Sequence, residues 1–466
     1  MIAQEALLGR PRSVSAVSGA RAVAQGGGFQ RGVLATVLAG GILFEAGTPD
    51  KLLELGTYLH RGIESWSGLP FPMSPLELLL MLGLFGAANS AMSESGIDRR
   101  RALLGRPMLF FSIALLVGLL RGAVGDGDVY IGLWELRYLL YVPACYAIAR
   151  SALRSTAHVA HLLRVGLAAA MLLALEGAYR RVVLIDSGSL GVIPEFAYEH
   201  ETALFLAMFV LFTFGVYVFR AFGRVRWLAI VFTPLLLYTL FATERRAGVV
   251  VLLIGLVVVA VTVFWVNRPA FFVTALPVLA ATALYVVLFW NTTGLLGQPA
   301  RAIRSLYEPD ARDAASNFYR MLETHNISVT IRSDPILGVG FGRPFIMAAP
   351  LPDLSWWPFW RYETHNNVLW VWLKTGIAGY LLFWFLVGSA ITRAAHAAKR
   401  LTDAYARSAA LFGLVAVIGT VVYAYVDLGL VSGRVTVFLG TMLGVLAVLE
   451  RLDRLDRPAR STKVAT

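Results

Sequence analysis

Repeated apolar runs, each long enough to cross a lipid bilayer, limit this chain to one broad fold class. Among the clearest are residues 198–219, 247–266, 367–391 and 408–427. A transmembrane helix needs about 20 consecutive apolar residues. Only 15% of the chain is charged, whereas soluble domains carry about 25% charged residues. The pattern therefore predicts an all-α polytopic membrane protein.

About twelve spans can be placed along the chain, and the first is the shortest. They are predicted at 32–47, 74–92, 107–124, 129–149, 158–177, 198–219, 227–243, 247–266, 270–290, 367–391, 408–427 and 435–450. The chain is then divided into an N-terminal tail (1–31), spans one to nine (32–290), a long polar loop (291–366), spans ten to twelve (367–450) and a C-terminal tail (451–466).

Lysine and arginine are unevenly distributed between the two sides of this arrangement. They concentrate in both tails and in every second connection, and the remaining short connections hold few. Because positive residues favour the cytoplasmic side, both termini are predicted to be cytoplasmic and the loop 291–366 to lie outside. The same distribution accounts for the net charge of +12 without nucleic-acid binding. The single cysteine, Cys145, excludes a disulfide framework.

The loop 291–366 is expected to carry the chemistry, because long ordered loops are seldom kept for connection alone. The sequence of this loop predicts a helix at about 310–330, with an apolar face made of Ala314, Phe318, Met321 and Leu322. A glycine-rich turn at 338–342 follows, and then a tryptophan-rich return to the membrane. The tetrapeptide Glu-Thr-His-Asn occurs twice in the loop, which we interpret as coincidence.

His365 is the first catalytic candidate. It lies where the loop meets the tenth span, beside Asn366. A neutral imidazole can take a proton from a hydroxyl group near pH 7. The alternative is a residue that only opens the helix, with Asn366 as its cap.

Arginines at predicted outer junctions are candidates for binding an anionic substrate. A guanidinium group offers a planar set of donors that suits phosphate oxygens, and a cation held at a membrane junction tends to face a cavity or a partner. The alternative for the arginines at helix ends is an interfacial side chain, paired with Glu244 in the case of Arg245 and Arg246. The alternative for the loop arginines is a solvated charge. The candidates are Arg245 and Arg246 before the eighth span, Arg180 and Arg181 after the fifth, and Arg320 and Arg343 in the long loop.

Three further polar features have structural interpretations. Asp126 and Asp128 form the Asp-x-Asp pattern with which some glycosyltransferases hold a metal, but Asp and Gly here favour a tight turn. No metal or other cofactor is predicted. Glu135 and Arg137 lie inside the fourth span and require partners on other helices. His200, at the start of the sixth span, is a weaker site candidate.

Three stretches of the second half resemble the O-antigen ligase/polymerase family of membrane glycosyltransferases. Thr243–Gly248 is similar to the family's Ser-Arg-Gly-type turn, with its arginine at Arg246. Arg320 followed by Asp334–Gly342 resembles an Arg…Pro-Leu-Leu-Gly-Val-Gly loop, and His365–Leu369 followed by Lys374–Gly379 resembles a His-Asn-x-x-Leu…Gly-x-x-Gly signature. The order of these stretches, and a long outer loop after the ninth span, also match the family's layout.

The resemblance implies a metal-independent, inverting transfer of a glycan from undecaprenyl diphosphate to an acceptor such as a lipid A-core sugar or a polysaccharide, outside the bacterial inner membrane. It implies that His365 is the general base and that Arg246, with Arg181 or Arg180, holds the diphosphate. Ligase, polymerase and protein O-glycosylation roles share these motifs. A polytopic transporter, and a metal-dependent glycosyltransferase using Asp126 and Asp128, are the alternatives from other classes.

Overall fold

The computed structural model describes residues 27–44, 73–93, 104–186 and 200–464, and every regular element within these ranges is a helix. The first group is α2 (Gly28–Leu43), α4 (Pro75–Ser93), α6 (Gly105–Val124), α7 (Val129–Ala152), α8 (Thr156–Tyr179) with the π-helix Arg180–Ile185, α9 (His200–Val218), α10 (Val225–Ala242) and α11 (Arg246–Val266). The second is α12 (Arg268–Ala270), the π-helix Phe271–Ala275, α13 (Leu276–Leu288), the 3-10 turn Leu295–Gly297, α14 (Gln298–Arg304), α15 (Ala311–Ser333), α16 (Asn367–Arg400), α17 (Ala404–Val426) and α18 (Gly433–Val464).

Nine helical segments in the described ranges are long and apolar enough to cross a membrane. All twelve predicted spans are helical, although α2 begins and ends earlier than predicted and residues 45–47 lie outside the described ranges. The three helices beyond the nine are α2, α4 and α7. The first two are short apolar helices, and α7 contains Glu135 and Arg137. The membrane character is confirmed, whereas twelve crossings and the orientation stay predictions.

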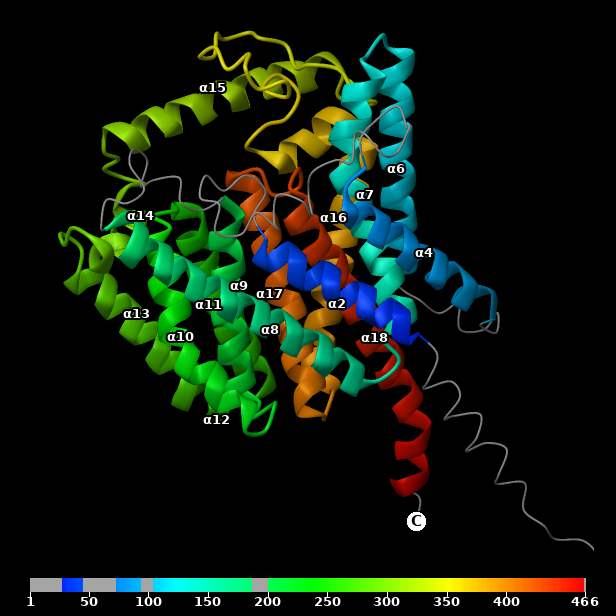
Figure 1. Cartoon of the computed structure of the whole chain (residues 1–466), viewed down its shortest axis with the longest axis vertical. Coiled ribbons are helices and arrows are strands. Elements are labelled where there is room, and N and C mark those ends of the chain that lie inside the picture. Colours follow the sequence, from blue (N-terminus) through cyan, green and yellow to red (C-terminus); the bar gives the residue numbers. More distant parts are fainter. Residues whose placement is uncertain (1–26, 45–72, 94–103, 187–199, 465–466) are drawn as a thin grey trace, which may run out of the picture.

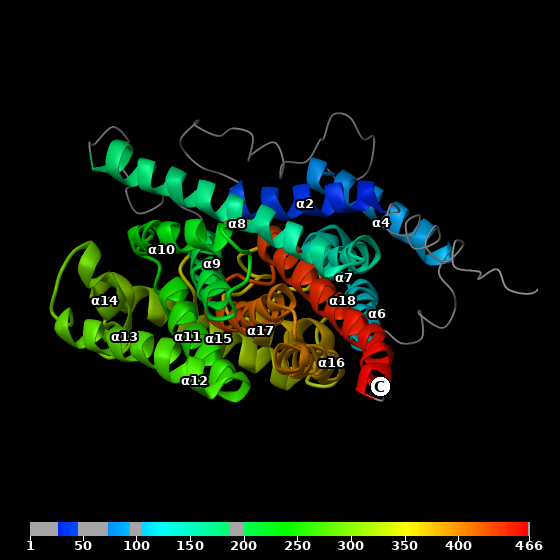
Figure 2. The ribbon, with the colours of Figure 1, turned by 90° about the horizontal axis from the view of Figure 1, so that it is seen from below.

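The helices form one bundle with a helical cover at one end (Figure 1). Helix α9 lies in the core, where Ala203 to Phe209 are at most 1% exposed. Helices α2, α4 and α8 lie along one side of the bundle (Figure 2). Helix α15 crosses the end of the bundle (Figure 1), so the long loop covers the ends of the membrane helices.

Two buried ion pairs supply the partners that α7 requires. Arg137 pairs with Glu77 of α4, and Glu77 also closes the start of α4 by accepting a hydrogen bond from the Ser74 backbone N–H at 2.7 Å. Glu135 lies 2.7 Å from Lys374 of α16, and both side chains are fully buried. These pairs satisfy charges that would be costly alone in a membrane.

The glycine-rich segment packs into a break in α16. Gly376 has φ +67° and ψ −176°, which interrupts the helix, and the Ile377 N–H donates instead to Pro335 O at 3.0 Å. Gly340 has φ +89°, and a Cβ there would lie 2.2 Å from the backbone nitrogen of Gly122 in α6. Only glycine fits this conformation and contact. The glycine-rich segment lies among α6, α7 and α16. Turns occur at residues 335–337 and 341–342, whereas residues 338–340 between them form no turn.

The predicted loop helix exists, but its predicted apolar face is wrong. Phe318 and Met321 are each 58% exposed. The buried face instead contains Asp313, Glu323 and Asn326. These polar groups are buried because each has a partner across the interface: Asn326, for example, exchanges two hydrogen bonds with the backbone of Ala349, at 2.9 and 2.7 Å.

Candidate functional site

A cleft of about 400 Å³ lies between α15 and the ends of α11, α16 and α17. Among the residues predicted from the sequence, Arg246, Arg320 and His365 line it. Glu323 also lines it, and Tyr425 comes from the end of α17. The cleft therefore joins positive and acid–base groups from segments far apart in the chain.

His365 is held at the start of α16 by the polar residues around it. The Asn366 side chain caps the helix by accepting from the Leu369 N–H at 3.1 Å. The buried Asn367 side chain donates to Thr364 O at 2.6 Å and accepts from the Leu430 N–H at 2.6 Å. The segment that carries His365 is thus fixed to the connection after α17.

Glu323 of α15 contacts His365 twice. Its carboxylate accepts from the His365 backbone N–H at 2.8 Å and lies 3.2 Å from the ring Nδ1. A carboxylate only accepts, so this contact places a proton on Nδ1 and leaves Nε2 as the proton acceptor. Glu323 is 2% exposed and the His365 side chain 22% exposed. The pair can therefore act as an oriented general base.

Tyr319 completes the surroundings of this pair. Its ring lies edge-on to the His365 ring, with centroids 5.6 Å apart. Burial and the nearby Glu323 carboxylate raise the pKa of Tyr319 to about 12. Tyr319 is therefore a neutral neighbour of His365 at ordinary pH.

Arg246 opens α11 and faces the loop. Its guanidinium lies 3.5 Å from Asp313 Oδ1, donates to Asn317 Oδ1 at 3.1 Å and reaches Ser305 Oγ at 3.5 Å. These partners belong to α15 and the end of α14, whereas Glu244 pairs with Arg181. The alternative that Glu244 neutralises Arg246 is therefore wrong. The contacts with Asp313 and Ser305 are as long as 3.5 Å, so the guanidinium keeps donor capacity for an anion.

Arg320 belongs to a second charged group at the same cleft. Its guanidinium lies 3.8 Å from Asp427, which is also 3.2 Å from His200 Nδ1. Burial alone would raise the pKa of Asp427, but the hydrogen bond and charge of His200, together with Arg320 and His365, lower it well below its usual range. The Asp427 carboxylate therefore stays ionised and fixes Arg320 near His365.

The remaining predicted arginines occupy different places. Arg181 pairs with Glu244 at 3.3 Å, next to the start of α11. Arg180 is buried and pairs with Glu176 of its own helix, which favours Arg181 as the accessible one. Arg245 is the N-cap residue of α11. Neither Arg180, Arg181 nor Arg245 lines the cleft.

Arg343 is not brought to the cleft. Its side chain packs against Gly125 and Gly127 in the α6–α7 turn, and its carbonyl accepts from Lys374 Nζ at 2.7 Å. The substrate-binding role predicted for Arg343 therefore lacks structural support.

The α6–α7 turn also accounts for the Asp-x-Asp pattern. Asp128 is the N-cap of α7, accepting from the Tyr130 N–H at 2.8 Å and the Ile131 N–H at 3.1 Å. Asp126 has φ +61°, as in a tight turn. In the part of the chain that the structure describes, no three His, Cys, Asp or Glu side chains are grouped so that they could hold a metal ion.

Sequence reasoning missed Glu323, Asp313 and Asp427. The repeated tetrapeptide Glu-Thr-His-Asn could have indicated Glu323. Glu323 is the glutamate of the first copy, and it binds His365, the histidine of the second copy. Asp427 directly follows the apolar run of α17 on the side where His200 begins α9. An acid at such a junction is costly without a partner. Its position at the end of an apolar run could therefore have identified Asp427 as a site candidate.

Comparison with known proteins gives one family. The family model described as O-antigen ligase matches residues 209–384, which include α11, α15 and the first part of α16. A comparison with curated proteins gives no match. The matched segment contains Arg246, Arg320, Glu323 and His365. This match supports the assignment of the chain to the O-antigen ligase family.

Proposed function

We propose that this protein is an inverting glycosyltransferase that moves a glycan from undecaprenyl diphosphate to an acceptor hydroxyl group, such as that of a lipid A-core sugar. The observation that carries the proposal is the cleft, where the His365–Glu323 pair lies with Arg246 and Arg320. The family match and the apolar helices point to a multi-pass inner-membrane protein of ligase or polymerase type. An outward-facing cleft is part of the proposal.

In the proposed reaction, His365 Nε2 takes the proton of the acceptor hydroxyl as its oxygen attacks the anomeric carbon. A new carbon–oxygen bond forms on one face, and the bond to the diphosphate breaks on the opposite face, which inverts the configuration. Glu323 stabilises the imidazolium that forms at His365. Undecaprenyl diphosphate leaves with the bonding electron pair.

Arg246 and Arg320 are proposed to bind the diphosphate. The negative charge on the leaving group grows as the sugar bond breaks, so fixed guanidinium groups stabilise the transition state more than the ground state. Arg181, beside the start of α11, is proposed to help the lipid diphosphate approach. We propose that no metal is required, because these arginines supply the positive charge and Asp128 serves as a helix cap.

The division of labour between His365 and Arg246 tests the proposal. We expect His365→Ala to keep donor binding and to lower transfer by about 10²–10⁴-fold, as for loss of a general base. Arg246→Ala should weaken both donor binding and turnover, and Arg246→Lys should restore little, because a point charge lacks the planar donor set. Binding and transfer are measured on folded variants in lipid. Near wild-type transfer by His365→Ala would refute its role as base.

A further inference from the structure

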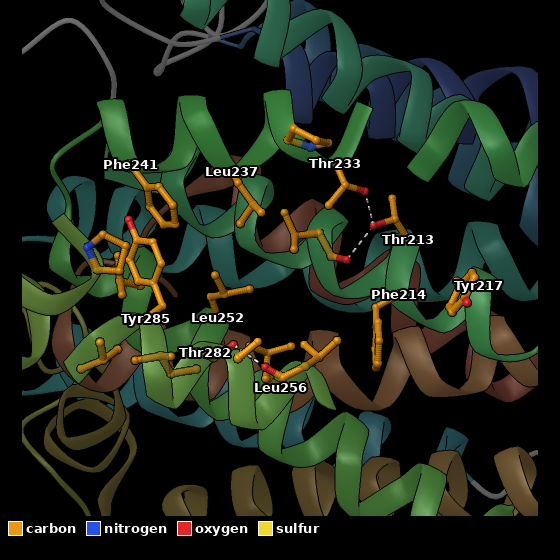
Figure 3. A pocket seen from close by; sticks show the side chains of 18 of the residues that line it. Thr213, Phe214, Tyr217, Thr233, Leu237, Phe241, Leu252, Leu256, Thr282 and Tyr285 are labelled. Carbon is orange, nitrogen blue, oxygen red and sulfur yellow. Dashed lines mark hydrogen bonds between the residues drawn. The ribbon is translucent and has the colours of Figure 1, made fainter. Parts of the chain in front are cut away.

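A second and larger cavity, of about 690 Å³, lies among α9, α10, α11 and α13 (Figure 3). Its walls are almost entirely apolar. Leu237 and Phe241 of α10, Leu252 of α11 and Tyr285 of α13 line it, and Figure 3 shows Phe241 and Tyr285 together at one side. The cavity therefore suits an apolar hydrocarbon chain.

The threonine hydroxyl groups in this cavity already have partners. Thr213 donates to Val210 O at 2.8 Å and lies 3.0 Å from the Thr233 hydroxyl, as Figure 3 shows. Thr233 donates in turn to Ala229 O at 2.9 Å. A water molecule needs two to four polar partners, and apolar cavities stay dry. Neither water nor a polar ligand is the natural occupant.

The cavity is bordered by helices whose other faces are exposed. Val231 of α10 and Val287 of α13 are each 71% exposed, and both helices belong to the predicted spans. In a bilayer these faces meet lipid chains. The lining residues Leu237 and Val286 are only half-buried, so a chain can enter from the lipid side.

The cavity and the cleft are lined by neighbouring residues in the first turn of α11, and α14 borders the cavity. Val249 lines the cavity, while the next residue, Val250, lines the cleft. Pro299 of α14 also lines the cavity, and α14 leads directly to Ser305, whose hydroxyl lies 3.5 Å from Arg246. Arg246 lies three residues before Val249 on α11, and residues at this spacing share a helix face. A molecule with its chain in the cavity can therefore place its head group beside Arg246.

We infer that this cavity binds the isoprenoid chain of the lipid diphosphate donor and so places the diphosphate at Arg246. The inference rests on the proposed function. From Val249 to Leu256 of α11 the lined length is about 10 Å, at 1.5 Å per residue. The cavity therefore holds the part of the chain nearest the diphosphate. A bulk phospholipid carries a single phosphodiester charge, so the diphosphate is the stronger ligand for this arginine.

Enlarging one side chain in the cavity tests the inference. In Leu237→Trp the new ring fills part of the cavity, and in the control Val231→Trp the same ring on the same helix faces away. Transfer is measured with a donor carrying a long isoprenoid chain and with one carrying a short chain of a single carbon atom, which does not reach into the cavity. Leu237→Trp should raise the KM for the long-chain donor on the order of tenfold, which corresponds to about 1.4 kcal/mol, and leave the short-chain donor unchanged. Val231→Trp should change neither.

A binding experiment makes this test independent of transfer. A photoreactive benzoylphenylalanine replaces Leu237, and the probe is a long-chain isoprenyl diphosphate in phosphatidylglycerol vesicles. Crosslinking to the probe, lost when unlabelled isoprenyl diphosphate is added, supports the inference even if no glycan is transferred. Crosslinking to phosphatidylglycerol alone, undiminished by the diphosphate, overturns it, as does an equal KM change for both donors. Absence of transfer with intact probe binding counts against the proposed function only.

Discussion

The two Glu-Thr-His-Asn copies provide a matched pair of substitutions. Glu323→Gln removes the charge that faces His365 but keeps an amide oxygen that can accept from Nδ1. Glu363→Gln changes the other copy in the same way. Burial raises the pKa of Glu363 well above its usual range, and the nearby Glu135 carboxylate adds to the effect. The Glu363 carboxyl group thus favours its neutral form, which glutamine resembles.

The size of the expected effect follows from the contacts of Glu323. Its carboxylate is 2% exposed and lies 3.2 Å from His365 Nδ1. Hydrogen bonds to charged groups contribute roughly 1.5–3 kcal/mol, and each 1.36 kcal/mol on the barrier is about tenfold in rate. We therefore expect Glu323→Gln to lower kcat roughly 10- to 100-fold with little change in the KM for the donor. Glu363→Gln should stay within about twofold of the wild type.

The assay is glycan transfer by purified variants in lipid, over a range of donor concentrations, with thermal unfolding measured in parallel. The unfolding control is required because the Glu323 carboxylate also accepts from the His365 backbone N–H at 2.8 Å. A folded Glu323→Gln variant with wild-type kcat would show that the pair only anchors the loop. Equal losses in the two variants would show that both glutamates act on packing.

Three further outcomes are expected. Cysteine placed at Ala315 should react with an impermeant reagent in intact cells and cysteine placed at Ser461 should not; the reverse labelling would overturn the orientation. Because the pKa of Asp427 is lowered in the folded protein, its carboxylate contributes stability above its unfolded pKa of about 4, and this contribution is lost as the pH falls further. The Tm difference between wild type and Asp427→Asn should thus shrink below about pH 4, and a constant difference would contradict the assigned ion pair. A chelator should leave transfer intact and Asp128→Asn should cost little, since asparagine caps helices as well as aspartate; loss of transfer that magnesium or manganese restores would favour a metal-dependent reaction.

The membrane helices could be predicted because their signal is local. Runs such as those of α9 and α11 are apolar throughout, and this property requires no knowledge of neighbours. The face of α15 could not be predicted in this way. Its buried side carries Asp313 and Glu323 because Arg246 and His365 lie opposite. The pattern of burial is therefore set by partners 67 and 42 positions away in the chain.

The site was predictable in part for a related reason. His365 and Arg246 stand at junctions between apolar and polar sequence, where a titratable or charged group is conspicuous. Glu323 lies within a polar helix, where an acid is ordinary. Arg343 follows the glycines directly and was therefore predicted to bind substrate. In the structure its side chain instead packs against the α6–α7 turn.

The segment inserted at the break in α16 bears on the order in which the protein assembles. Residues 335–342 bind backbone groups of Leu373 and Ile377, and Asn367 binds the N–H of Leu430. All these partners leave the ribosome after the loop does. A growing chain thus carries His365 and Arg246 well before it can form the cleft between them. Chains that end before residue 430 would contain His365 and Arg246 but no assembled cleft. The proposed activity should therefore appear only once the last membrane helices are present.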